Sequence, residues 1–67
     1  MDVSLLRAKM HERKMSISAL SESIGIDDST FYRKVNENGE KFTVAQARAM
    51  ASLLELTPED TTAIFFS

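Results

Sequence analysis

Glycine and proline are scarce in this chain, and this scarcity limits the folds available to it. The sequence has 67 residues, of which two are glycine and one is proline. A β-sheet fold of this length needs many tight turns, and glycine and proline are among the residues that most often form them. The sequence therefore predicts an all-α fold, with one domain over residues 1–67.

Cysteine is absent from the sequence, so neither a disulfide nor a thiolate metal site can stabilise the chain. The one histidine, His11, has no neighbours with which to form a metal site or a Ser-His-Asp triad. A core of this size contributes about 3–5 kcal/mol of stability. We therefore expect well-packed helices, self-association or both, and neither a metal nor a cofactor.

Hydrophobic residues make up 43% of the chain and charged residues 27%, which is the balance of an ordinary globular protein. No apolar run approaches the roughly 20 residues of a membrane span, and the first residues lack the features of a signal peptide. We expect a cytoplasmic protein with no membrane partner.

The net charge of −2 counts mildly against a nucleic-acid partner, because binding to phosphates favours a basic face. The distribution of charge weakens this objection. All eight lysines and arginines lie between Arg7 and Arg48, where they accompany six acidic residues, so this segment has a net charge of +2.

Apolar spacing and capping residues predict five helices, over residues 3–13, 17–24, 28–36, 44–54 and 58–65. The polar residues expected to cap their first turns are Ser16, Asp27, Thr43 and Thr57. The side chains expected to face the core are Val3, Leu6, Met10, Ile17, Leu20, Ile24, Phe31, Val35, Val44, Ala47, Ala51 and Leu54.

The segment from Ser16 to Val35 contains the spacing of a helix-turn-helix. Gly25 lies between two short helices, and the small residue Ser21 lies four positions before it. The two helices of this motif cross closely, so the contact position must be small, and glycine adopts the backbone of the turn at little cost. Ile26 and Phe31 are then placed to anchor the second helix on the core.

Residues 15–36, MSISALSESIGIDDSTFYRKVN, resemble the helix-turn-helix of phage repressors and Cro-like regulators. Residues 42–66 resemble the last helices of the same domains. The resemblance implies a compact five-helix lambda-repressor-like domain, with the helix-turn-helix at helices 2 and 3. It also implies a bacterial host cell, a double-stranded operator DNA partner, and a third helix that lies in the major groove.

By position in the family, the residues that would face bases are Asp28, Ser29 and Arg33, with Tyr32 beside them. Arg33 is the strongest candidate, because a guanidinium can pair with both O6 and N7 of guanine. The candidates for phosphate contacts are Thr30, Lys34, Asn36 and Lys41. Some of these side chains have structural alternatives: Asp28, Ser29 and Thr30 as residues that support the start of the helix, and Lys34 as a solvated side chain.

The sequence departs from the family pattern in two places. Related regulators often carry a phosphate-binding glutamine at the first residue of helix 2, where this chain has Ile17. Ser16 or Ser18, with the backbone N–H groups of the helix start, could replace part of that contact. In addition, Asp27 and Asp28 repel phosphates, which implies weak DNA affinity or help from a second subunit.

The C-terminal residues Ile64, Phe65 and Phe66 are candidates for a homodimer interface. Adjacent aromatic residues on a helix point in different directions, so one of the two is expected to be exposed. A two-fold dimer would place two reading helices about 34 Å apart, to match a palindromic operator. The alternative is that both phenylalanines pack within one monomer.

These observations favour a Cro-like phage or prophage transcriptional repressor. The alternative is a protein-interaction module, an antirepressor or co-repressor that binds a partner repressor protein. The sequence shows no paired carboxylates in a cleft, no nucleophile with a base partner and no Gly-rich phosphate loop, so we expect no enzyme activity.

Overall fold

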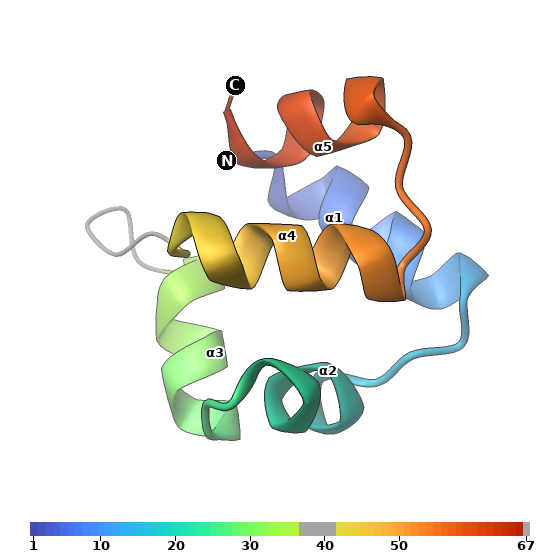
Figure 1. Ribbon diagram of the computed structural model, residues 1–67. Coiled ribbons are helices and arrows are strands. Elements are labelled where there is room, and N and C mark those ends of the chain that lie inside the picture. The colour runs from blue at the N-terminus through green and yellow to red at the C-terminus, as the bar shows by residue number, and fades with distance from the viewer. Residues whose placement is uncertain (37–41, 67) are drawn as a thin grey trace.

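The computed structural model describes residues 1–36 and 42–66. The helices in this part of the chain are α1 (Val3–Glu12), α2 (Ile17–Ile24), α3 (Asp28–Asn36), α4 (Val44–Leu53) and α5 (Pro58–Phe65) (Figure 1). The bounds of α2, α3 and α5 are those that the sequence predicted, and α1 and α4 each end one residue earlier. The all-α, five-helix prediction is confirmed.

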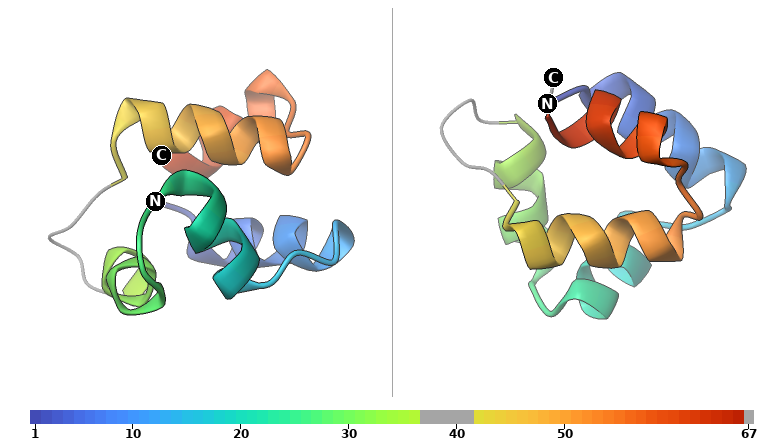
Figure 2. Two further views of the ribbon diagram at one scale, coloured as in Figure 1. Left: turned by 60° about the horizontal axis from the view of Figure 1, so that its bottom comes forward. Right: turned by 45° about the horizontal axis from the view of Figure 1, so that its top comes forward.

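Helix α4 lies between the two pairs formed by the other helices. It contacts α2 on one side and α5 on the other, while α2 also contacts α3 and α5 also contacts α1. Figure 1 shows α2 and α3 below α4 and α5 above it, and the right view of Figure 2 shows α1 beside α5. The helix-turn-helix is therefore one half of the molecule, and the pair of α1 and α5 is the other.

Every helix contributes to one hydrophobic core. Its buried side chains are Leu6, Met10, Leu20, Phe31, Val35, Ala47, Met50, Leu54 and Ile64. Val44, which we expected in the core, is 62% exposed, so that prediction is wrong. Val44 is the first residue of α4, and the core-facing side of that helix begins one turn later, at Ala47 and Met50.

The first and last helices of the described chain are linked by a hydrogen bond and an ion pair. The backbone N–H of Asp2 donates to the carbonyl of Ile64 at 2.8 Å, and Lys9 of α1 forms an ion pair with Asp60 of α5 at 3.3 Å. The C-terminus of α1 is tied to that of α4, because Nε of Arg13 donates to the carbonyl of Leu54 at 3.2 Å. The half that lies away from the helix-turn-helix is thus held by polar contacts as well as by the core.

Three of the connections between helices share one backbone design. Each has a residue with left-handed backbone, then a half-buried apolar residue, then the residue that caps the next helix. The three sequences are Lys14-Met15-Ser16, Gly25-Ile26-Asp27 and Glu55-Leu56-Thr57. In each, the apolar residue donates its N–H to the carbonyl five positions earlier, which is the Schellman motif; these bonds join Met15 to Met10, Ile26 to Ser21 and Leu56 to Ala51 at 2.9, 3.0 and 2.9 Å.

Within the described residues, no helix combines the length and the apolar character that crossing a membrane requires.

Candidate nucleic-acid interface

The turn between α2 and α3 has the geometry that the sequence predicted. Gly25 adopts a φ of 80°, in the left-handed region, which glycine reaches without the steric cost that other residues incur. Ser21 is 1% exposed at the position where α2 approaches its neighbours. The small side chain therefore permits close packing, while Ile26 and Phe31 anchor α3 to the core.

Helix α3 has one buried side and one exposed side. Phe31 and Val35 belong to the core, and Thr30 and Lys34 lie at the boundary. The exposed side consists of Asp28, Ser29, Tyr32, Arg33 and Asn36. Asp28, Ser29 and Arg33 are the side chains that we predicted to face bases, and Tyr32, predicted to lie beside them, is 46% exposed. The helix therefore presents them together on the outer surface of the helix-turn-helix.

Asp27 supports the start of α3. Its Oδ1 accepts from the backbone N–H of Thr30 at 2.8 Å and from the hydroxyl of Ser29 at 3.3 Å. The Thr30 hydroxyl, the Thr30 N–H, the Ser29 hydroxyl and the charge of Arg33 together hold the pKa of Asp27 below its ordinary value. The carboxylate is thus stabilised by bonds to its ionised form, and its charge is directed at the helix start, where an anion is favourable.

Asp28 bridges the two helices of the motif. Its Oδ2 accepts from the hydroxyl of Ser18, on α2, at 2.6 Å. A serine hydroxyl has one proton to donate, and a phosphate oxygen can only accept. In this arrangement Ser18 therefore gives its proton to Asp28, and the phosphate contact that we predicted for it would require this bond to break.

Thr30 is engaged in a similar way. Its backbone N–H donates to Asp27, and its hydroxyl accepts from Nη2 of Arg33 at 3.2 Å. The chain Asp27–Thr30–Arg33 holds the guanidinium on the exposed side of α3. Lys34 lies with its Nζ 5.6 Å from the centre of the Phe42 ring, a distance at which cation–π attraction operates.

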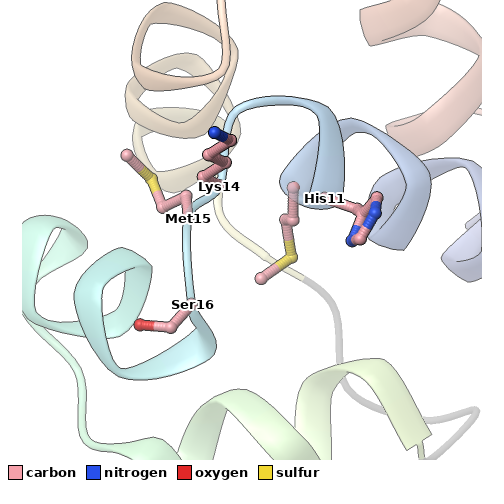
Figure 3. Close-up of a pocket in the computed structure, with 5 residues that line it drawn as sticks. His11, Lys14, Met15 and Ser16 are labelled. Atoms are coloured by element: carbon pink, nitrogen blue, oxygen red, sulfur yellow. The ribbon is translucent and has the colours of Figure 1, made fainter.

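The start of α2 is the other polar feature of this half. Ser16 caps the helix, because its Oγ accepts from the N–H of Ala19 at 3.1 Å, and its own proton stays available to a phosphate. Figure 3 shows Ser16 at the edge of a shallow hollow, open to solvent, which Met10, His11, Lys14 and Met15 also line. The sequence did not connect Lys14 with this helix start. The left-handed turn at Lys14 (φ 53°) carries no glycine that could have signalled it.

The remaining residues considered for DNA contacts lie in different environments. Ile17, which replaces the usual glutamine, packs against the core and takes no part in a polar contact surface. Asn36 ends α3 and is exposed. Lys41 lies outside the described residues.

The C-terminal residues divide between core and surface. Ile64 is 0% exposed, so its side chain is not available to a second subunit, and this part of the predicted interface is corrected. Phe65 is half-buried and packs edge-on against Phe42, with 6.2 Å between the ring centres. Phe66 is 64% exposed, in line with our expectation that one of the two aromatic residues faces solvent.

The charge of the helix-turn-helix itself is slightly negative. Residues 16–36 contain two basic residues, Arg33 and Lys34, and three acidic residues, Glu22, Asp27 and Asp28. Two of the acidic residues accept hydrogen bonds from hydroxyls within the motif. Attraction to phosphates is therefore weaker here than on a basic recognition surface.

A family model of the Cro/C1-type helix-turn-helix DNA-binding domain matches residues 6–62. Searches of curated proteins and of solved structures returned no match. The family match spans all five helices, at least in part, and includes the turn at Gly25 and the whole of α3. The chain therefore belongs to the Cro/C1-type helix-turn-helix DNA-binding domains.

Proposed function

We propose that this chain is a Cro-like transcriptional repressor of phage or prophage type, which reads operator DNA with α3. The observation that carries the proposal is the exposed side of α3, where Ser29, Tyr32 and Arg33 share a surface opposite the buried Phe31. A helix placed in this way inserts its first turns into the major groove. Repression follows when the bound protein occludes a promoter.

Arg33 is the residue proposed to read a guanine. Its guanidinium is held toward the first turn of α3 by Thr30, and such a group pairs with O6 and N7 of guanine. We expect Arg33→Ala to weaken operator binding by about 1–3 kcal/mol and to relax one base position. Arg33→Lys is the matched control: it keeps the charge and loses the two-pronged pairing. Gel-shift titration with operator-region DNA and with a random duplex separates the loss of guanine pairing from the loss of charge. Equal weakening of binding to both duplexes would contradict base reading.

The N-terminus of α2 is proposed to bind a phosphate, with Ser16 and Lys14 as its polar groups. Backbone N–H groups at a helix start attract an anion, and Lys14 borders the same hollow as Ser16 (Figure 3). We expect Lys14→Gln to reduce the slope of log affinity against log salt by about 1 for each subunit. Lys9→Gln is the control, because it removes the same charge from a lysine that pairs with Asp60. A slope unchanged by Lys14→Gln would remove this residue from the interface.

A two-fold dimer is proposed to form through the surface around Phe66. An exposed aromatic residue of this size on a small domain favours association, and two subunits would offset the weak phosphate attraction of each helix-turn-helix. Analytical ultracentrifugation of wild type and Phe66→Ser measures this. Val44→Ser is the matched control, since Val44 is 62% exposed on another element. We expect only Phe66→Ser to lower the molecular mass in solution; a wild-type monomer at the concentrations that saturate DNA would contradict the dimer.

An interaction module that binds a partner repressor is the second candidate. The negative charge of residues 16–36 favours it, because that charge reduces affinity for DNA. The same gel-shift titration decides between the two candidates. No retention of operator-region DNA by the folded wild type, at any salt concentration, would favour the interaction module over the repressor.

A further inference from the structure

A hydrogen bond between Ser18 and Asp28 links α2 to the reading surface. It joins residues ten positions apart, across the turn at Gly25, and its length is 2.6 Å. Both side chains are exposed, so core packing does not hold them in place. A short bond from a hydroxyl to an ionised carboxylate is about twice as strong as a bond between neutral groups.

This bond fixes an orientation that an aspartate otherwise lacks. The last torsion of an aspartate side chain is broad, so an exposed carboxylate turns easily. Ser18 occupies Oδ2, and the bond therefore holds the plane of the carboxylate while Oδ1 remains to accept from a ligand. Asp28 is the first residue of α3, and the N-terminal residues of a reading helix approach base edges.

We propose that Ser18 is a positioning residue for base selection, and that the oriented Asp28 selects an exocyclic amine. In the major groove, cytosine N4 and adenine N6 donate, whereas guanine and thymine present acceptors at O6, N7 and O4. An ionised carboxylate accepts from the first two bases and repels the others. This inference rests on the proposed function, since it assigns a base preference to one position of that operator.

The proposal changes the role of Ser18 from a phosphate contact to a residue that acts through Asp28. The two roles differ in what they affect. A phosphate contact stabilises binding to every sequence equally, whereas a positioning residue changes discrimination at one base pair and leaves binding to a random duplex unaltered.

Selection of binding sites from a random-sequence duplex library tests the proposal. The proteins compared are wild type, Asp28→Asn, Ser18→Ala, Ser18→Thr and Ser23→Ala. Ser23 is the matched control, because it is another exposed serine of α2 whose hydroxyl bonds to the carbonyl of Ala19 within its own helix. Far-UV circular dichroism verifies that each variant is folded, and Ser18→Thr retains the hydroxyl should Ser18→Ala lose its structure.

We expect wild type to exclude guanine and thymine at one position. Asp28→Asn should reduce that exclusion about tenfold, because the neutral amide can donate as well as accept. Ser18→Ala should reduce it about threefold at the same position, while Ser18→Thr and Ser23→Ala leave it unchanged.

Two results overturn the inference while the proposed function stands. In one, Ser18→Ala leaves the Asp28-dependent preference intact and lowers only the melting temperature; in the other, it weakens all sequences equally, as loss of a phosphate contact would. A folded wild type that enriches no sequence overturns the proposed function, and the inference with it.

Discussion

The connection between α2 and α3 and the connections at Lys14 and Glu55 use the same Schellman motif with different residues. All three place one residue in the left-handed region, at φ values of 53°, 80° and 51° for Lys14, Gly25 and Glu55. Only the turn of the helix-turn-helix uses glycine. Its φ is the largest of the three, and an added Cβ at Gly25 would meet no atom within 4 Å, so the backbone conformation is what favours glycine there.

The residues at the start of each motif also differ. The carbonyl that closes the motif belongs to Met10 in α1, to Ser21 in α2 and to Ala51 in α4. The two helix C-termini outside the reading half are further held by Arg13, which contacts both Leu54 and Glu55. The α2–α3 turn combines a small buried residue, Ser21, with a glycine that adopts the left-handed backbone at low cost. The comparison teaches that this turn relies on an unstrained backbone, whereas the C-termini of α1 and α4 have left-handed residues other than glycine and are held by contacts of Arg13.

The largest expected effect comes from exchanging residues between motifs. Ser21→Met introduces the side chain that α1 carries at the same place, into a position that is 1% exposed. We expect a loss of about 1–3 kcal/mol in unfolding free energy, because extra volume in a packed site forces its neighbours apart. Urea denaturation followed by circular dichroism measures it.

Ser21→Ala is the control for that exchange. Oγ of Ser21 is buried and has no hydrogen-bond partner within the described residues. Removal of a buried polar group that lacks a partner does not destabilise a protein through a lost bond. Ser21→Ala should therefore be neutral or slightly stabilising. A Met variant as stable as the Ala variant would show that the α2–α3 contact tolerates a large side chain, as the motif at the end of α1 does with Met10.

Gly25→Ala has the next largest expected effect. An added Cβ would meet no atom within 4 Å, so the cost comes from the backbone alone, about 1–2 kcal/mol for a non-glycine residue with left-handed backbone. Gly25→Asn should cost less, since asparagine tolerates this region better. The difference between the two urea midpoints is the measurement, and equal midpoints would mean that the backbone strain has relaxed.

Lys14→Gly makes the α1–α2 turn resemble the α2–α3 turn. We expect it to raise the unfolding free energy, by less than Gly25→Ala lowers it. Relief of the left-handed backbone exceeds the extra entropy of glycine in the unfolded chain, so we expect a gain of about 0.5–1 kcal/mol. The same variant should bind DNA more weakly, because it removes the proposed phosphate cation. A thermal melt and a salt titration measure these two effects. A variant that is more stable and unchanged in DNA binding would leave Lys14 with a structural role only.

The smallest expected effect is a pH dependence of stability, which should arise at only one of the three connections. Their capping residues are Ser16, Asp27 and Thr57, of which only the aspartate ionises. The pKa of Asp27 is lowered in the folded chain from its ordinary value of 3.8. Its contribution to stability is therefore complete above about pH 3.8 and is lost as the pH falls through the lower, folded-state pKa.

Asp27→Asn provides the comparison. Asparagine also caps helices well, so the variant should resemble wild type at neutral pH and lose less stability in acid. Urea midpoints measured from neutral pH to below pH 3.8 test this. Parallel curves for the two proteins would contradict the role of the ionised cap.

Much of the fold could be predicted from the sequence because its signals are local. The caps at Ser16, Thr43 and Thr57 and the glycine at position 25 each act within one turn of chain, and they fix the bounds of α2 and α5. The left-handed turns at Lys14 and Glu55 were not predicted, since those residue types do not favour that backbone. Val44 was assigned to the core from spacing alone, which does not show where a helix loses its neighbours.

The candidate site was harder to predict for the same reason. The resemblance to the family placed Asp28, Ser29 and Arg33 toward bases, with Tyr32 beside them, so the exposed side of α3 was anticipated. The bond from Ser18 to Asp28 crosses a turn, and its geometry depends on the angle at which two helices meet. Lys14 lines the same hollow as Ser16 after a left-handed turn that the sequence did not signal.

The hydrogen bond from Asp2 to the carbonyl of Ile64 has a consequence for how the domain comes apart. Free ends of most domains fray first, but here each end holds the other. Trimming the last turn would also release the first, so damage at either end spreads to the opposite one. The reading helix, α3, lies in the middle of the sequence, so loss of structure at the two ends does not reach it directly.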